Sequence, residues 1–362
     1  MEPSRRRSWM GFWGASARAS CAESMRRAKT GLIDAMLILL MTALGACAPT
    51  IIPPGPPVAS PAFTGDTLVA EDGVRLPLHS WPANPNTRAV IVALHGFNDY
   101  GTFIKAAADY WSGRGITTYA YDQRGFGDAP NRGFWPGEGA FARDLITAVR
   151  AVQERHPGVP VFVLGDSMGG AVTLTAMTGP TPPAVAGVIL VAPAVWARET
   201  MPFYQRWALW ISAHTLPWLT VTGRGLNIVA SDNIEMLRAL ARDPKVIKAT
   251  RIDTIWGLAN LMDSALEAAG ELDAPALILY GAKDEIITEK PTKAMLARLP
   301  EEASPRQTVI RYENGYHMLL RDLGAEAAWN DIVQWIDGRI AAGPSGRDTR
   351  QGATLYGRGG MR

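Results

Sequence analysis

A short apolar run that ends in a Gly-x-Ser-x-Gly turn is the feature of this sequence that most restricts its fold. Residues 161–165 have the apolar, β-branched character of a buried strand, and residues 171–174 can continue as a helix. A strand that turns directly into a helix brings two backbones close together, and Gly165 and Gly169 remove the Cβ atoms that would clash there. The pattern predicts that Ser167 is a nucleophile at the tip of the turn with its hydroxyl exposed. The alternative is that Ser167 only caps the following helix.

Apolar segments with strand character alternate with helix-like segments along most of the chain. The predicted strands are 89–94, 116–122, 161–165, 188–192, 276–280 and 308–312, and the predicted helices are 103–111, 137–155, 168–177, 291–299 and 325–340. The strands are continuously apolar, which is typical of a parallel sheet covered by helices on both faces. Two earlier segments, 67–70 and 74–81, predict an antiparallel hairpin. The fold class is therefore α/β with a mostly parallel central sheet.

The alternation of strands and helices is interrupted between residues 193 and 271. This stretch holds no clear strand and is rich in leucine and tryptophan. Aromatic residues at helical spacing are usually part of a core, but their concentration in one insertion predicts a helical cap with an apolar underside.

A serine hydroxyl needs a base within hydrogen-bond reach and a third group that orients the base. His317 lies directly after the last predicted strand, and loops after parallel strands lie at the same edge of the sheet as the serine turn. We therefore predict that His317 is the base. The other histidines are expected to have structural or solvated positions: His79, His95, His156 and His214.

The orienting acid and the donors for the oxyanion should come from further loops at this edge. Asp284 follows the strand after the insertion and is the preferred acid, with the adjacent Glu285 as the alternative. The backbone N–H of Met168 directly follows the nucleophile and is one expected oxyanion donor. The N–H of Phe97 is the other, because Gly96 lets the loop after an early strand turn its amide inward.

Four motifs in this order resemble the α/β-hydrolase family, over about residues 70–340. They are His95-Gly96, Gly165-Asp166-Ser167-Met168-Gly169-Gly170, Gly281 to Asp284, and Gly315-Tyr316-His317. The chain looks most like the monoacylglycerol lipase and lysophospholipase group of serine aminopeptidase S33 type. The resemblance implies an α/β-hydrolase fold with an inserted cap and a Ser-Asp-His triad. It also implies a serine hydrolase that cleaves carboxylic esters of lipids and needs no metal or organic cofactor.

Two departures from the family pattern lie beside the expected site. Asp166 replaces a common histidine, and Asn98-Asp99 replaces the usual residues after His-Gly. They leave an amide- or peptide-cleaving enzyme of proline-iminopeptidase type open, with Glu235 or Asp263 holding a substrate amino group. A catalytically silent lipoprotein that binds lipid is the alternative from a different class.

The N-terminal region predicts export and a lipid anchor. A basic stretch at 25–29 precedes an apolar run at 35–44, which is shorter than the roughly 20 residues that cross a bilayer. Leu44-Gly45-Ala46-Cys47 resembles a bacterial lipobox, which implies that Cys47 carries the lipid. The expected location is the bacterial cell envelope, with a lipid-anchored domain facing the periplasm.

These observations divide the chain into four parts. Residues 1–46 are predicted to be an N-terminal extension with the signal, 47–66 a Pro-rich tether, 67–341 the hydrolase domain with its cap at about 193–271, and 342–362 a disordered tail. The net charge of +2 gives no indication of a nucleic-acid partner. The expected partners are an acyl ester or lipid substrate and a membrane.

Overall fold

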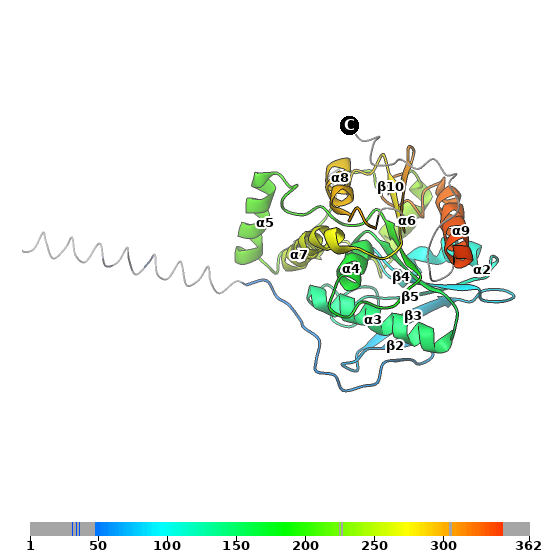
Figure 1. Ribbon diagram of the computed structural model, residues 1–362. Helices are drawn as coiled ribbons and strands as arrows, with labels where there is room; N and C mark the ends of the chain where they lie inside the picture. The colour runs from blue at the N-terminus through cyan, green and yellow to red at the C-terminus, as the bar shows by residue number, and fades with distance from the viewer. Residues whose placement is uncertain are drawn as a thin grey trace, which may run out of the picture.

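A nine-stranded, mostly parallel sheet runs through the computed structural model (Figure 1). The structure describes residues 48–342, apart from Arg224, Leu226, Ser304 and Pro305, together with Gly31, Asp34 and Met36. The strand order is β1-β2-β3-β5-β4-β6-β7-β10-β11. The strands are β1 (Ala62–Phe63), β2 (Thr67–Val69), β3 (Arg75–Trp81), β4 (Ala89–Leu94), β5 (Ile116–Tyr121), β6 (Val161–Asp166), β7 (Gly187–Val191), β10 (Ala276–Gly281) and β11 (Gln307–Tyr312).

The parallel part of the sheet extends from β5 to β11, and β1, β2 and β3 add an antiparallel edge. Every residue of β4, β5, β6, β7 and β10 is buried, which explains why these strands read as continuous apolar runs. The structure confirms the predicted mostly parallel sheet.

Helices cover both faces of the sheet, and successive residues of one strand contribute to different cores. In β4, Val90 and Val92 pack beneath α3 and α4, whereas Ile91 packs beneath α2 and α9. Within residues 48–342, the structure has these helices outside the insertion: α2 (Lys105–Ser112), preceded by η1 (Gly101–Ile104), α3 (Glu138–Arg155), α4 (Met168–Met177), α8 (Glu289–Arg298) and α9 (Ala325–Ala342). The two-residue period of a strand therefore divides its apolar side chains between two helical layers.

The insertion between β7 and β10 is largely helical. It contains α5 (Phe203–Thr215), α6 (Ile234–Arg242), α7 (Ile252–Ala268) and η2 (Ala269–Glu271). It also contains a pair of two-residue strands that the sequence did not indicate, β8 (Thr220–Val221) and β9 (Thr250–Arg251). Helix α7 packs on α4, whereas α5 lies at the edge of the molecule beyond α7 (Figure 1).

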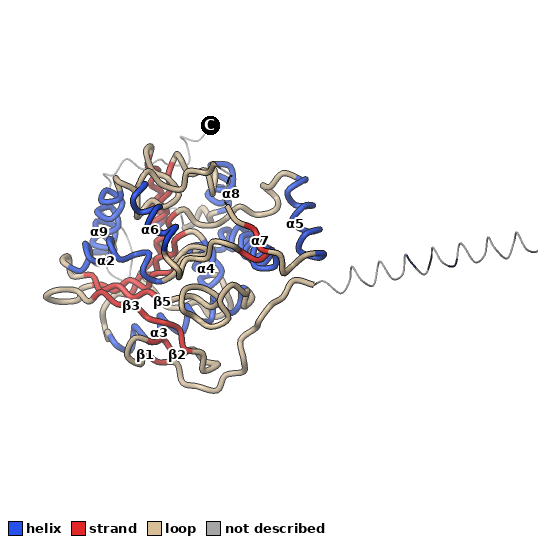
Figure 2. The backbone as a smooth tube through the Cα atoms, turned by 180° about the vertical axis from the view of Figure 1, so that it is seen from behind, coloured by secondary structure: helices blue, strands red, loops and turns tan. Residues whose placement is uncertain are grey.

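The Pro-rich segment lies along the hydrolase body and does not stand away from it. The N–H of Ile52 donates to the carbonyl of Trp135, and the N–H of Val58 donates to the carbonyl of Glu71. Figure 2 shows this segment passing from the base of α5 to β1. The segment is extended and is attached to the body at these points.

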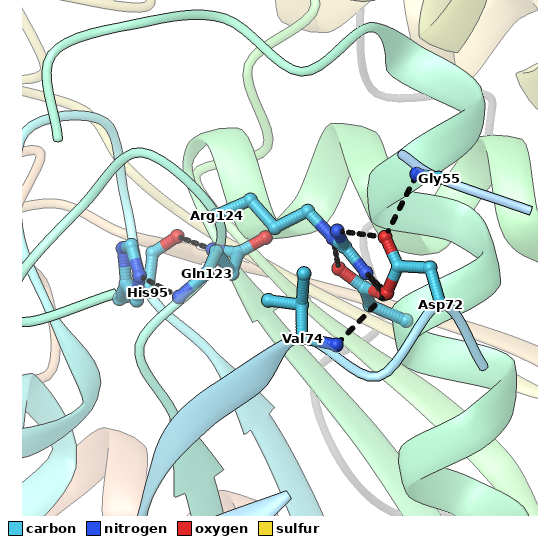
Figure 3. A network of polar contacts seen from close by, with 7 residues as sticks. Gly55, Asp72, Val74, His95, Gln123 and Arg124 are labelled. Atoms are coloured by element: carbon cyan, nitrogen blue, oxygen red, sulfur yellow. Dashed lines mark hydrogen bonds and ion pairs between the residues drawn. The ribbon is translucent and has the colours of Figure 1, made fainter. Parts of the chain in front are cut away.

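A buried arginine ties the first hairpin to the centre of the fold (Figure 3). Arg124, in the loop after β5, donates to Asp72 of the hairpin turn and to Asp144 of α3. Asp72 also accepts from the N–H groups of Gly55 and Val74. One guanidinium thus joins the N-terminal segment, the sheet and a covering helix.

Three predictions fall wholly or mostly outside the described part of the chain: the signal, the lipid-bearing Cys47 and the tail at 342–362, of which only Ala342 is described, as the last residue of α9. Within the described part, no helix has the length and apolar character needed to cross a membrane.

Candidate active site

The serine turn has the close packing that its glycines suggested. Ser167 directly follows β6 and precedes α4, with φ of 49° and ψ of −110°. A Cβ atom on Gly165 would lie 2.3 Å from the carbonyl oxygen of Gly169, and one on Gly169 would lie 2.3 Å from that of Leu94. Ser167 therefore occupies a strained backbone conformation that only this crossing of strand and helix maintains. Its side chain makes no capping hydrogen bond to α4.

The structure brings Ser167, His317 and Asp284 together from three loops. Nε2 of His317 lies 3.0 Å from Oγ of Ser167, and Nδ1 of His317 lies 2.8 Å from Oδ2 of Asp284. His317 follows β11, Asp284 follows β10 and Ser167 follows β6, so all three lie at the carboxyl edge of the parallel strands. This arrangement allows Ser167 to lose a proton to His317 while Asp284 holds the other ring nitrogen.

Asp284 is itself held in place by backbone amides. Its Oδ1 accepts hydrogen bonds from the N–H groups of Ile286 and Ile287, both at 2.8 Å. The loops of Asp284 and His317 are in direct contact, because a Cβ atom on Gly281 would lie 2.3 Å from the carbonyl oxygen of Gly315. Glu285, the alternative acid, instead accepts from the N–H of Val229 in the insertion.

The protonation of His317 is set by opposing effects. Burial disfavours the charged imidazolium, but the hydrogen bond and charge of Asp284, together with the charge of Asp166, raise the pKa of His317 above its ordinary value. A histidine with a raised pKa is a stronger base once it is deprotonated, which suits proton removal from a hydroxyl.

The loop after β4 lies against the serine turn. A Cβ atom on Gly96 would be 3.3 Å from the Cβ atom of Ser167, so a side chain there would crowd the nucleophile. Phe97 follows Gly96, and its ring packs edge-on against Phe126 with 5.6 Å between centroids. Among the described residues, no recorded hydrogen bond engages the N–H of Phe97 or that of Met168 at the start of α4. Both predicted donors are thus free to bind an oxyanion.

His95 supports this loop and takes no part in the triad. One ring nitrogen, Nδ1, lies 2.8 Å from the carbonyl oxygen of Gly96, and Nε2 accepts from the N–H of Gln123 at 3.0 Å (Figure 3). Burial lowers the pKa of His95, which keeps the ring neutral. The remaining histidines also contact other groups: His79 binds Asp122, His156 binds Tyr119, and His214 binds the carbonyl of Trp210.

The two departures from the family pattern have distinct surroundings. Asp99 forms an ion pair of 2.7 Å with Arg321, and both side chains are nearly buried. Asp166 is buried beside Gly96, and burial raises its pKa to about 6. Arg321 also acts electrostatically on Asp166 and on His317. Arg321 was not singled out in the sequence, because nothing local connects it to a loop more than 200 residues earlier.

The insertion contacts the loops on either side of Ser167, and the serine residue as a whole is largely buried. Ser167 is only 8% exposed. On one side, the N–H of Ile247 donates to the carbonyl of Asn98, and Nδ2 of Asn98 donates to Oγ1 of Thr250. On the other side, the N–H of Met318 donates to the carbonyl of Ala230. The insertion is therefore joined both to the loop after β4 and to the loop that carries His317.

Glu235 and Asp263, the acids considered for holding a substrate amino group, both have arginine partners. Glu235 pairs with Arg238 on the exposed face of α6. Asp263 of α7 pairs with Arg198 and also accepts from its backbone N–H. Neither carboxylate is left unpaired for an incoming ammonium group.

The chain aligns with curated proteins over nearly the whole length of those proteins. The chain is 27% identical over 285 residues to a monoglyceride lipase of Mus musculus, which covers 77% of this chain and 92% of that protein. It is 25% identical over 276 residues to a monoacylglycerol lipase of Mycolicibacterium smegmatis. This alignment covers 73% of this chain and 93% of that protein.

Solved structures give the same fold. A soluble variant of monoglyceride lipase from Saccharomyces cerevisiae superposes with a TM-score of 0.62 at 21% identity, over 80% of this chain and 99% of that one. A monoacylglycerol lipase from Paleococcus ferrophilus superposes with a TM-score of 0.59 at 20% identity, over 73% of this chain and 99% of that one. These likenesses confirm the α/β-hydrolase fold. The sequence profile of one family, described as serine aminopeptidase, S33, matches residues 85–324. The chain belongs to this family of α/β-hydrolases.

Proposed function

We propose that this protein is a serine hydrolase that cleaves carboxylic esters of lipids, with monoacylglycerols and lysophospholipids as the substrate class. The hydrogen-bonded series Ser167–His317–Asp284 is the observation that carries the proposal. The monoglyceride lipases among its relatives support the lipid ester as substrate. The paired states of Glu235 and Asp263 disfavour a peptidase that binds a free amino terminus.

The reaction follows from the geometry of the three side chains. Oγ of Ser167 attacks the ester carbonyl while Nε2 of His317 takes its proton, and Asp284 stabilises the imidazolium. The N–H groups of Phe97 and Met168 bind the oxyanion of the tetrahedral intermediate. The C–O bond then breaks, and His317 returns the proton to the leaving alcohol. Water attacks the acyl-serine by the same steps in reverse, which releases the acid and restores Ser167.

A fluorophosphonate probe and a panel of esters test this proposal. The wild-type protein should label, and it should hydrolyse p-nitrophenyl esters and monoacylglycerols of graded chain length. Ser167→Ala should abolish labelling and lower kcat by roughly 10⁶-fold. Ser112→Ala is the matched control, because this serine is partly exposed at the end of α2 and its hydroxyl donates only to the carbonyl of Asp109. Hydrolysis of aminoacyl amides without any ester turnover would contradict the proposal, and a protein that never labels would be the silent lipid-binding lipoprotein.

We further propose that Cys47 carries a lipid that anchors the protein in a bacterial cell envelope, facing the periplasm. The lipobox-like Leu44-Gly45-Ala46-Cys47 after a short apolar run supports this location. Cys47→Ser should leave an unprocessed precursor and remove incorporation of labelled fatty acid. Normal processing of this variant would refute the anchor.

A further inference from the structure

Two loops that carry predicted site residues follow strands that are not neighbours in the sheet. The loop after β4 (residues 95–100) carries Phe97, and the loop after β11 (residues 313–322) carries His317. Strands β6, β7 and β10 lie between β4 and β11. Strand pairing therefore relates the two loops only through three intervening strands, so side-chain contacts between the loops decide how they lie relative to each other.

One ion pair joins the two loops directly. Nη2 of Arg321 lies 2.7 Å from Oδ2 of Asp99, and the two side chains are only 12% and 9% exposed. The other carboxylate oxygen of Asp99, Oδ1, accepts from the N–H of Tyr100 at 2.9 Å. Asp99 is two residues after Phe97, and Arg321 is four residues after His317. The pair thus connects the backbone beside a predicted oxyanion donor to the backbone beside the predicted base.

The backbone between Phe97 and Asp99 bends sharply. Asn98 has φ of 66°, in the left-handed region that few residues other than glycine and asparagine adopt. A nearly buried ion pair adds little net stability relative to neutral partners, because the loss of hydration offsets the attraction between the charges. The contact of Asp99 with Arg321 therefore contributes more to the geometry of this bend than to the stability of the fold.

Each loop also has contacts that do not depend on the ion pair. In the loop after β4, the carbonyl of Asn98 accepts from the N–H of Ile247. In the loop after β11, the carboxylate of Asp322 accepts from the N–H of Tyr316 at 2.8 Å and from the hydroxyl of Ser231 at 2.6 Å. Both loops should therefore stay folded when the ion pair is removed.

The guanidinium of Arg321 also offsets negative charge around His317. Three carboxylates interact with this histidine: Asp284 at Nδ1, Asp166 at the end of β6, and Asp322 on its own loop. Burial and the charge of Arg321 lower the pKa of His317, whereas Asp284 and Asp166 raise it, and the net shift is upward. Without Arg321 the imidazolium would be favoured further, and the base would stay protonated to higher pH.

We propose that Arg321 is a positioning residue of the site. Through its ion pair with Asp99, it holds the loop after β4 against the loop after β11. Its charge also offsets the charge of Asp166 near the base. The inference rests on the proposed function, since it takes Phe97 as an oxyanion donor and His317 as the base.

Three variants separate position from charge, with a water-soluble short-chain p-nitrophenyl ester as substrate from pH 5 to 9. Arg321→Met removes the contact and the positive charge, so kcat should fall about 10- to 100-fold and the acid limb of kcat/KM should move to higher pH. Asp99→Asn removes the ion pair but keeps the arginine, so kcat should fall by a similar factor without a shift of the acid limb to higher pH. Arg321→Lys keeps the charge, so the acid limb should stay in place and kcat should recover in part.

Arg321→Met leaves Asp99 buried without its partner, so a double variant, Asp99→Asn with Arg321→Met, removes the unpaired charge. It should match Arg321→Met in kcat and in the position of the acid limb, because both substitutions remove one shared contact. Arg298→Met is the control, because Arg298 forms an exposed ion pair with Glu199 at the end of α8. This control should change neither kcat nor the acid limb. Circular dichroism gives the folded fraction of each variant.

A profile of Arg321→Met that matches the control would overturn the proposal, and so would an unchanged kcat in Asp99→Asn. A loss of kcat that follows the loss of folded protein, with the acid limb in place, would show that the pair is merely structural. A wild-type protein that hydrolyses no ester would instead refute the proposed function. An NMR titration of His317 would then decide on Arg321, because the pKa of His317 should be higher in Arg321→Met than in the wild type, and equal values would contradict the inference.

Discussion

At the scale of single residues, two carboxylates in different positions raise the pKa of His317. Asp284 binds Nδ1 directly, whereas Asp166 acts through its charge and also lies beside Gly96 of the loop after β4. Burial raises the pKa of Asp166 to about 6, so its carboxylate is ionised at neutral pH only at a cost in free energy. The residue before the nucleophile is therefore an electrostatic part of the site.

Asp166→Asn should move the acid limb of the pH profile of kcat/KM to lower pH. The base must be neutral to accept a proton, so kcat/KM rises as pH increases through the raised pKa of His317. Removing the negative charge of Asp166 removes one of the effects that favour the imidazolium, so the pKa of His317 falls. The measurement is kcat/KM for a soluble ester from pH 5 to 9, with exposed Asp109→Asn as the control. An acid limb that stays in place, or moves to higher pH, would contradict this role.

At the scale of elements, the junction of β6 and α4 holds the site together. Strand β6 is flanked by β4 and β7, and α4 begins directly against the end of β4 through Gly169. The backbones of β4, β6 and α4 meet at this junction, where a side chain would have no space. The position of Ser167 is therefore fixed by surrounding backbone, which cannot move aside as a flexible side chain can.

Gly169→Ala should destabilise the protein by about 3 kcal/mol or more, because a methyl group 2.3 Å from the carbonyl oxygen of Leu94 forces α4 away from the sheet. The matched control is Gly338→Ala in α9, where a Cβ atom meets nothing within 4 Å. This control should leave stability unchanged or raise it by up to about 1 kcal/mol. Urea unfolding measures both variants, and equal stability of the two would show that the junction can relax.

At the scale of the whole molecule, long-range polar contacts join segments that the sheet alone does not connect. Arg124 links the N-terminal hairpin to α3, Arg321 links the loop before α9 to the loop after β4, and Asn98 links that same loop to the insertion. The site thus depends on contacts made at its perimeter as well as on the three central side chains.

Arg124→Gln should lower the free energy of unfolding by about 3–5 kcal/mol, because it leaves Asp72 and Asp144 buried without their cationic partner. Arg306→Gln is the control, since its pair with Asp273 is largely exposed and should contribute less than about 1 kcal/mol. Chemical unfolding followed by circular dichroism compares the two losses. Equal losses would mean that the Arg124 network is replaceable by water.

Local sequence patterns predicted much of the fold and also indicated the candidate site residues. Continuous apolar strands indicated a parallel sheet, and Gly165 and Gly169 indicated the sharp turn at Ser167, because both features depend on near neighbours in the chain. His317 and Asp284 were identified because loops after parallel strands share one edge of the sheet. The roles of these residues in catalysis, and of Phe97 and Met168 as donors, remain predictions for the experiments above.

Outside the insertion, the sequence by itself determined the main strands and helices and which side chains stand at the strand ends, because backbone sterics and apolar periodicity are local. Only the tertiary structure decided what surrounds those side chains. It buried Ser167, paired Asp99 with the distant Arg321, bound the Pro-rich segment to the body and left large apolar side chains of α5 exposed. These outcomes depend on which surfaces meet across long stretches of chain, and apolar residues follow the same helical period whether they face a core or solvent.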